Sequence, residues 1–361
     1  MMTYNYSIYM PHLRPREAVS AITKLSKLWP VIGVSGLRQV GKSTLLRDLL
    51  KIANYVTMDD DDARADAENS PKVFLAKYPR PFIVDEIQKV PKLFDALKSE
   101  VDKKRIPGTF YISGSQTFSS GKLTRESLTG RIGSIKLYPM TLKESKGAKT
   151  KLSIEDFVKG MKRGGLPVPM FLRDDESRRI FWDGWIETTL VRDLAQAYGK
   201  GYDLDFARLV LKELTNIFSQ GLYPEISLFS KDSRKVTKYL NALESIFVLT
   251  RIPNHEKGIG RDHWIMGDSG LACHLLRSHL KTEQATLTLA RHLIFNEIAA
   301  KYEYALKKIN IGYFKSARGE PIDFVAENIP IKVITRSSGA LGWHKKGLEG
   351  AMKKMKSTQG F

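Results

Sequence analysis

The chain has 361 residues, 42% of them hydrophobic, which is enough to bury cores in two or three structural units. No apolar run approaches the roughly 18 residues that span a bilayer, and the first residues lack a basic segment followed by an apolar one, so we expect a cytoplasmic protein without a membrane partner. The single cysteine, Cys273, excludes an internal disulfide and a cysteine-rich metal site, and we expect it to be a small buried side chain.

The chain is strongly basic. Lys and Arg outnumber Asp and Glu by 58 to 39, which gives a formal net charge of +19. Such an excess favours a polyanionic partner such as nucleic acid, because it raises non-specific attraction. Net charge does not locate a binding site, and a solvated basic surface without a partner is the alternative.

The first third of the chain alternates short apolar runs with helical segments. This alternation is typical of a parallel sheet covered by helices. A lysine-rich stretch, 143–151, then precedes mainly helical sequence, so we expect the first domain to end at residue 142. The expected strands are 30–35, 55–58, 81–84, 109–113 and a last one near 135–140, and the expected helices include 43–52 and 91–103.

The second half is mainly helical at first and ends in strands. A helix at 233–245 and a strand at 246–252 are followed by a Gly-containing turn and a returning strand at 264–266. Helices followed by a hairpin outline a winged-helix segment. A further helix, 290–308, precedes three expected strands at 312–314, 322–326 and 329–334. We find no internal repeat.

Residues 36–43 match the pattern G-x-x-x-x-G-K-[ST] and lie between a predicted strand and a predicted helix. The glycines let the backbone curl around an anion, and the helix that follows directs its positive end at the phosphates. Lys42 is expected to reach the β and γ phosphates, and the Ser43 hydroxyl to bind Mg²⁺. The predicted nucleotide-binding residues are Gly36, Gln39, Val40, Gly41, Lys42, Ser43 and Thr44.

A second motif places two carboxylates at the end of the strand at 81–84. Asp85 and Glu86 should therefore lie at the carboxyl edge of the sheet, where ligands bind. We expect Asp85 to hold Mg²⁺, through water, and Glu86 to orient the attacking water. Ser115 follows the next predicted strand and is expected to contact the γ-phosphate or this water; an ordinary turn is the alternative.

Two other charged features are more ambiguous. Arg131 is expected to stabilise charge in the transition state, from its own chain or from a neighbouring subunit, but a surface or nucleic-acid-facing role is equally consistent with the sequence. The acidic run 59–62 follows a predicted strand, where consecutive acids usually cap the next helix rather than bind a metal.

Seven short motifs occur in an order that is more specific than any one of them. They are 36–43, 84–91, 113–115, 127–131, 163–167, 186–193 and 266–271. In this order they resemble the prokaryotic AAA-type ATPases whose C-terminal half is a domain of unknown function, and the resemblance covers nearly the whole chain. It implies an α/β fold: an AAA-like P-loop NTPase core (1–142), a helical lid (143–203), a winged-helix segment (204–284) and a small α+β domain similar to restriction endonucleases (285–361).

The last domain departs from the nuclease pattern that the resemblance implies. Relatives of the nuclease type carry Glu-Val-Asp-Phe and then Ile-Pro-Ile-Glu-Val-Lys. Here only Asp323 of the acids is kept, Lys332 stands where Glu belongs, and Ile334 replaces the Lys. A charge-reversed ligand would repel the cation that it should bind, so we expect this domain to be catalytically inactive. Glu297 is a candidate upstream acid, but a glutamate on a helix surface is the simpler interpretation.

The helix at 233–245 has an apolar stripe and a polar face. That face would suit the major groove of double-stranded DNA, and internal packing as a spacer is the alternative. The tail 331–361 forms a second basic patch. The polar face of the helix carries Arg234, Lys235, Lys238 and Asn241.

We therefore expect an enzyme that hydrolyses ATP to ADP and phosphate with Mg²⁺ and couples its nucleotide state to a DNA-binding C-terminal half. One alternative is a nucleotide-gated switch that controls a protein partner with little turnover. A DNA-cleaving nuclease is a further alternative, which the replaced residues at 332 and 334 disfavour. The sequence leaves oligomer formation open.

Overall fold

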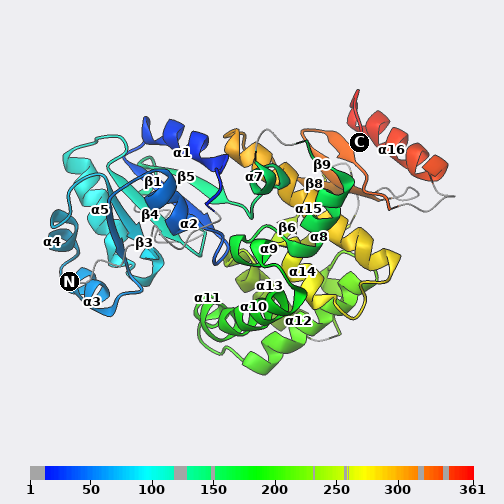
Figure 1. Cartoon of the computed structure of the whole chain (residues 1–361), viewed down its shortest axis with the longest axis horizontal. Coiled ribbons are helices and arrows are strands. Elements are labelled where there is room, and N and C mark those ends of the chain that lie inside the picture. The colour runs from blue at the N-terminus through cyan, green and yellow to red at the C-terminus, as the bar shows by residue number, and fades with distance from the viewer. Residues whose placement is uncertain are drawn as a thin grey trace.

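The computed structural model describes residues 13–117, 128–147, 151–230, 232–255, 258, 260–315, 321–335 and 341–361, without the side chains of 341–343. Figure 1 shows an α/β lobe built from the N-terminal third of the chain, in blue and cyan. Green helices of the middle third lie beside it, and a small sheet with the last helix, in orange and red, lies at the other end. None of the described helices is both long and apolar enough to cross a membrane.

The α/β lobe is built on a five-stranded sheet in the order β2-β3-β4-β1-β5. All of its strand pairs are parallel. Strands β1, β3 and β4 are buried along their whole length, as their unbroken apolar sequences predicted. The predicted parallel α/β sheet is thus confirmed. The strands are β1 (Val31–Gly36), β2 (Asn54–Thr57), β3 (Phe82–Asp85), β4 (Phe110–Gly114) and β5 (Ile132–Leu137).

Helices cover both faces of this sheet, because alternate residues of each strand point to opposite sides. On one face, Ile32 and Ile135 pack in a core that includes α1 and continues into the C-terminal half. On the other face, Val84 and Ile112 pack in a separate core with residues of α3, α4 and α5. The helices are α1 (Ala18–Ser26), α3 (Asp61–Asn69), α4 (Pro71–Ala76) and α5 (Lys92–Lys103), with a 3-10 turn η3 (Ile87–Lys89).

The acidic run after β2 caps a helix, as predicted. The Asp60 carboxylate accepts a hydrogen bond from the Ala63 amide at 2.8 Å and forms the N-cap of α3. The helix expected at 43–52 is shorter and less regular than its sequence suggested. It begins at Lys42 as α2 (Lys42–Thr44) and continues as a π-helical turn, η2 (Leu45–Leu49).

The middle of the chain is helical, and its helices pack on the same core as α1. Two of the weak motifs meet here: the buried Asp268 carboxylate accepts hydrogen bonds from the amides of Gly165, Leu166, Gly270 and Leu271. The elements are α7 (Leu142–Lys146), α8 (Ile154–Arg163), α9 (Pro167–Phe171), α10 (Asp175–Thr188), η4 (Thr189–Leu194, π-helical), α11 (Ala195–Tyr198), α12 (Leu204–Ser219) and η5 (Ile226–Leu228).

The predicted helix and hairpin of the next segment are present. Helix α13 precedes β6, which pairs with β7 in an antiparallel hairpin, and Cys273 is buried on α14 as expected. The elements are α13 (Ser233–Ser245), β6 (Leu249–Ile252), β7 (His263–Met266), α14 (Ser269–Leu275) and α15 (Glu283–Tyr304).

The chain ends in a three-stranded antiparallel sheet, β10-β9-β8, with α16 packed against it. Asp323 is buried in β9, where Arg291 Nε lies 2.7 Å and Lys332 Nζ 3.7 Å from its carboxylate oxygens. Two cations thus surround the acid that the nuclease pattern assigns to a metal. The elements are β8 (Gly312–Phe314), β9 (Ile322–Ala326), β10 (Ile329–Ile331) and α16 (Leu341–Met355).

Glu297 is neither a surface residue nor an acid beside Asp323. It is largely buried on α15, and its carboxylate accepts a hydrogen bond from the Leu142 amide at 2.8 Å. Burial raises its pKa to about 7. The sequence alone could not show this, because the partner is a backbone group 155 residues away.

Candidate nucleotide site

The loop after β1 curls around the side chain of Lys42. Gly41 has a φ of +98°, which favours glycine, and Gln39 also lies in the left-handed region. A side chain at Gly36 would place its Cβ 2.4 Å from the Leu137 carbonyl oxygen, so only glycine fits there. The buried Lys42 ammonium donates to the carbonyls of Gly36 and Leu37 at 3.1 and 3.2 Å.

The Lys42 ammonium is buried near two carboxylates. Burial lowers the pKa of its ammonium, and the nearby carboxylates of Glu86 and Asp85 raise it again in part. Phosphate oxygens beside Lys42 would stabilise its charge, because a buried cation needs a close anion.

Asp85, the last residue of β3, is contacted by side chains from α2, β2 and β4. Its carboxylate accepts hydrogen bonds from the hydroxyls of Ser43 at 2.6 Å and Tyr55 at 2.8 Å, and also from Ser113. These residues meet because the carboxyl ends of parallel strands lie at the same edge of the sheet. Burial, and then Asp85, raise the pKa of the Tyr55 phenol, so Tyr55 remains a donor.

Glu86 leaves the sheet at the same edge. It has a left-handed backbone, with φ of 53°, which is uncommon for a residue other than glycine and is often found at functional sites. Its carboxylate accepts a hydrogen bond from Gln88 Nε2 at 2.5 Å and lies 3.3 Å from the Ser115 hydroxyl. The structure thus places Ser115 beside Glu86. This agrees with the expectation that Glu86 orients the attacking water and that Ser115 contacts this water or the γ-phosphate.

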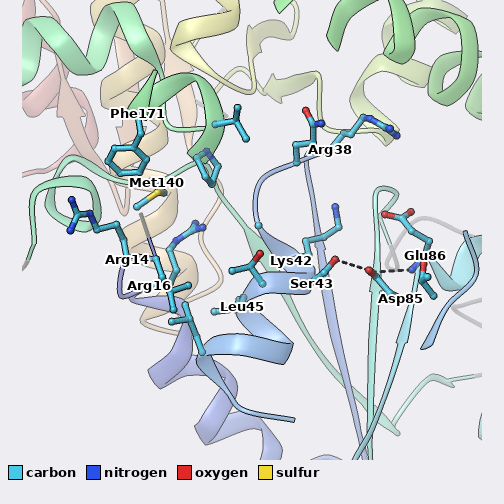
Figure 2. A pocket seen from close by; sticks show the side chains of 18 of the residues that line it. Arg14, Arg16, Arg38, Lys42, Ser43, Leu45, Asp85, Glu86, Met140 and Phe171 are labelled. Carbon is cyan, nitrogen blue, oxygen red and sulfur yellow. Dashed lines mark hydrogen bonds between the residues drawn. The ribbon is translucent and has the colours of Figure 1, made fainter. Parts of the chain in front are cut away.

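A cavity of about 730 Å³ is lined by Lys42, Ser43, Tyr55, Asp85 and Glu86. In Figure 2, Lys42 and Ser43 lie toward Asp85 and Glu86, and an apolar wall lies on the opposite side. The Arg14 guanidinium sits 5.4 Å from the centre of the Phe171 ring on that wall. The wall is formed by Leu13, Leu45, Leu49, Met140, Pro167, Val168, Phe171 and Leu172.

The apolar wall was missed from the sequence. Its members come from before α1, from η2, from the segment after β5 and from α9 with the residue after it, so no local pattern joins them. Pro167 belongs to one of the seven motifs, which was the only signal available.

Arg16 was missed as well. Its guanidinium donates to the carbonyls of Val40 at 3.0 Å and Tyr138 at 2.6 Å and pairs with Glu144 at 3.2 Å. This buried side chain therefore holds the phosphate loop, the end of β5 and α7 together.

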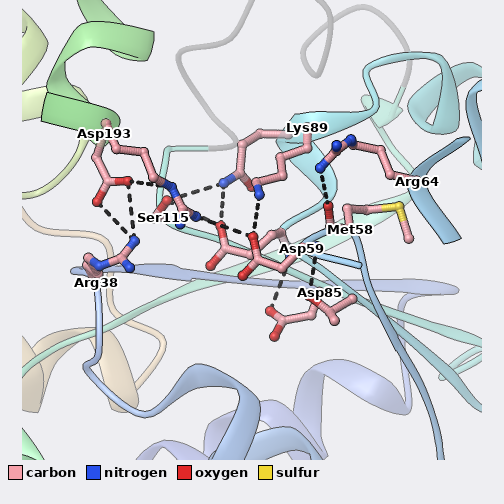
Figure 3. Close-up of polar contacts among 12 residues, drawn as sticks. Arg38, Met58, Asp59, Arg64, Asp85, Lys89, Ser115 and Asp193 are labelled. Atoms are coloured by element: carbon pink, nitrogen blue, oxygen red, sulfur yellow. Dashed lines mark hydrogen bonds and ion pairs between the residues drawn. The ribbon is translucent and has the colours of Figure 1, made fainter. Parts of the chain in front are cut away.

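A polar network connects the site to the helical region (Figure 3). Arg38 of the phosphate loop pairs with Asp193 of η4 at 3.3 Å, and Arg192 lies 3.3 Å from Asp59, which also pairs with Lys89. Arg192 and Asp193 belong to the motif 186–193. Their contacts give that motif a physical role, which the sequence did not reveal.

Arg131 lies away from the cavity. It precedes β5, and its carbonyl accepts a hydrogen bond from the Val31 amide at the start of β1, whereas the phosphate loop follows the end of β1. Its guanidinium pairs with Asp102 at 2.6 and 2.9 Å. The structure therefore does not bring Arg131 to the site of its own chain. A role across a subunit boundary and a surface or nucleic-acid-facing role are the predictions that this position leaves.

The polar face of α13 is largely occupied by contacts within the chain. Lys235 Nζ pairs with Asp203 at 3.1 Å, and Lys238 Nζ lies 3.7 Å from the centre of the Tyr198 ring. The Asn241 side chain accepts a hydrogen bond from Arg251 at 2.6 Å. Arg234 is exposed. These contacts favour the spacer interpretation for most of this face.

Comparison with protein families separates the two halves of the chain. Residues 29–146 match the family model of an AAA domain. These residues form an AAA-type P-loop domain. Residues 154–282 match a model described as a domain of unknown function (DUF8612).

The chain also has relatives in several bacteria. Uncharacterized proteins of Mycobacterium tuberculosis and Mycobacterium bovis are both 33% identical over 183 residues, which cover 50% of this chain and 40% of each relative. This chain thus matches only two fifths of their length. An uncharacterized protein of Haemophilus influenzae is 26% identical over 281 residues, covering 67% of this chain and 68% of that protein.

Two solved structures resemble this chain distantly. A Walker-type ATPase of Pyrococcus abyssi matches with a TM-score of 0.42 and 13% identity, over 72% of this chain and 95% of the other. A signal-transduction ATPase of Pyrococcus horikoshii with a tetratricopeptide repeat sensor matches with a TM-score of 0.25 and 11% identity, over 82% and 48%.

Proposed function

We propose that the chain binds Mg-ATP in the cavity beside Lys42 and hydrolyses the bond between its β and γ phosphates. The observation that carries this proposal is the meeting of Lys42 and Ser43 with Asp85 and Glu86 at one edge of the sheet. The apolar wall opposite would receive the base. Its aromatic ring and aliphatic side chains suit a flat purine, and Arg14 would lie at its edge.

The donor set fits a magnesium ion. Ser43 and Asp85 supply a hydroxyl and a carboxylate, which are oxygen ligands of the kind that Mg²⁺ prefers. Ser43 Oγ and Asp85 Oδ2 lie 2.6 Å apart. When bound, the ion would neutralise charge that develops on the phosphates. Lys42 would bind the β and γ phosphates from the other side.

Glu86 would accept a hydrogen bond from the attacking water and orient it. Its position is set by Gln88 and Ser115, which contact the same carboxylate oxygen. Since phosphoryl transfer depends mainly on positioning and charge stabilisation, this held carboxylate suits the role.

Phosphate release by the purified protein tests the proposal, with Lys42→Ala and Glu86→Gln as variants. Lys42→Ala should weaken ATP binding at least tenfold, since it removes a charge-assisted contact of roughly 1.5–3 kcal/mol. Glu86→Gln should bind ATP normally and lower the rate by roughly 10²–10⁴-fold. Unchanged binding by Lys42→Ala would place the nucleotide elsewhere.

A switch with little turnover is the second candidate. The Gln88 amide donates to one oxygen of the Glu86 carboxylate at 2.5 Å, so this oxygen would have to exchange Gln88 for the water if it were the one that orients it. A wild-type rate as low as that of Glu86→Gln, with tight ATP binding in both, would favour this function over hydrolysis.

We further propose that nucleotide state controls a basic C-terminal half that binds double-stranded DNA. The contacts that α13 side chains make with Asp203, Tyr198 and Arg251 shift the expected surface toward α16. The exposed lysines of α16 project from a helix held to the terminal sheet by Ala351 and Met355. A nuclease activity is disfavoured because Arg291 and Lys332 pair with Asp323. The exposed lysines of α16 and the residue after it are Lys345, Lys346, Lys353, Lys354 and Lys356.

A further inference from the structure

The ion pair between Arg38 and Asp193 joins the phosphate loop to the helical region. Arg38 Nη1 lies 3.3 Å from both carboxylate oxygens of Asp193. The Asp193 side chain is 8% exposed and that of Arg38 26%. This pair is therefore shielded from solvent enough to matter energetically, unlike most surface pairs.

Arg38 also faces the nucleotide cavity. It lines the same space as Lys42, and its charge acts on the Lys42 ammonium, as does that of Asp193. Figure 2 shows Arg38 above Lys42 on the same side of the cavity. The charges of Arg38 and Asp193 thus both act on the Lys42 ammonium.

An arriving γ-phosphate would compete with Asp193 for Arg38. Arginine pairs with phosphate through two parallel hydrogen bonds, and such charge-assisted bonds are stronger than neutral ones. ADP lacks this group and leaves the pair with Asp193 undisturbed. The competition therefore distinguishes the two nucleotides.

The release of Asp193 would be transmitted beyond the pair. Asp193 lies in η4, a π-helical turn, and such turns often occur at functional sites. Its neighbour Arg192 contacts Asp59, which also pairs with Lys89 near Glu86. A displacement of Asp193 would therefore affect η4 directly and, through Arg192 and Asp59, the segment that carries Lys89.

We propose that Arg38 is a γ-phosphate-specific binding residue that exchanges Asp193 for the phosphate when ATP binds, and thereby loosens η4 from the phosphate loop. This inference rests on the proposed ATP site. Arg38 is thus a determinant of the preference for ATP over ADP, and Asp193 is its competitor.

Binding of ADP and of a non-hydrolysable ATP analogue, measured by calorimetry, tests the exchange. Arg38→Gln should weaken the analogue at least tenfold relative to ADP, because it loses a charge-assisted contact. Asp193→Asn should have the opposite effect: tighter analogue binding with ADP affinity unchanged, since the competitor is gone. The double variant should behave as Arg38→Gln. Asp183 pairs with Arg179 and His274 in the helical region. Asp183→Asn is therefore the matched control and should change neither affinity.

Hydrogen exchange gives a second readout that folding defects do not imitate. The amides of 189–194 should exchange faster with the ATP analogue than with ADP in the wild type, and equally in Arg38→Gln. Asp193→Asn could weaken the binding of both nucleotides alike, or the two nucleotides could give equal hydrogen exchange in the wild type. Either result would show that the ion pair only stabilises the fold and that the γ-phosphate does not replace Asp193. Failure of the wild type to bind either nucleotide would instead refute the ATP site itself.

Discussion

The Ser43 hydroxyl donates a hydrogen bond to the Asp85 carboxylate across 2.6 Å, so a residue of the phosphate loop and the end of β3 are already joined. Both oxygen atoms would be ligands, direct or through water, of a magnesium ion. The geometry therefore makes the ion and the nucleotide depend on the same two side chains.

Ser43→Ala should weaken ATP binding only when Mg²⁺ is present. The variant loses a hydroxyl ligand, whereas Lys42 and the loop backbone still hold the phosphates. Calorimetry with Mg²⁺ and with a chelator measures how much the ion strengthens ATP binding. We expect this gain in affinity to be at least tenfold smaller in Ser43→Ala than in the wild type. Ser43→Thr keeps the hydroxyl and serves as the control. Equal losses with and without the ion would show that Ser43 shapes the loop instead.

Arg131→Ala should leave the ATPase rate of a monomer within about twofold of wild type, because substitutions at exposed positions away from the site usually have small effects. Arg131 pairs with Asp102 at the opposite edge of the sheet from Lys42. If the protein proves oligomeric and the variant is slow, mixing it with Glu86→Gln should restore activity. Slow turnover in a proven monomer would contradict this placement.

DNA binding should depend steeply on salt if it occurs, since each neutralised phosphate contributes about 0.9 to the log-log slope. Changing Lys345, Lys346 and Lys353 of α16 to Ala should lower the slope by up to about three. The corresponding triple change of Arg234, Lys235 and Lys238 should lower it by no more than about one, because two of these side chains are engaged within the chain. A larger effect of the second variant would restore α13 as the DNA surface.

Glu297→Gln should flatten the dependence of the unfolding temperature on pH. Burial raises the pKa of Glu297 in the folded protein to about 7, above its ordinary value of 4.5, so its protonated form favours the fold. This contribution is fully present below about pH 4.5 and is lost as the pH rises through 7. The wild type should therefore lose stability across that window relative to Glu297→Gln. Glu349→Gln, exposed on α16, is the control; parallel curves for wild type and Glu297→Gln would contradict the assignment.

Local patterns predicted the phosphate loop and the sheet well. Gly41, Lys42 and Ser43 act within a few residues of each other, and Asp85 follows an apolar run whose burial is evident from its composition. For the same reason the strands around Ile83 and Ile112 were placed within one or two residues.

Contacts between distant segments were not predicted from the sequence. Asp193 meets Arg38 across 155 positions, and the Arg14–Phe171 contact joins the segment before α1 to α9. Lys235 looked free on a helix face because its spacing shows only which side it occupies, not that Asp203 lies there. Periodicity defines faces, whereas partners depend on tertiary packing.

Arg16 has a practical consequence for fragment design. The AAA family match begins at residue 29 and ends at 146, yet Arg16 supports the Val40 carbonyl from before that start. Pro167 and Phe171 complete the apolar wall from beyond that end. A truncated protein cut at 29 and 146 would keep every residue of the G-x-x-x-x-G-K-[ST] pattern but lose the support of its loop and one wall of its cavity. Expression of the shortest nucleotide-binding unit should therefore start before Leu13 and run past Leu172.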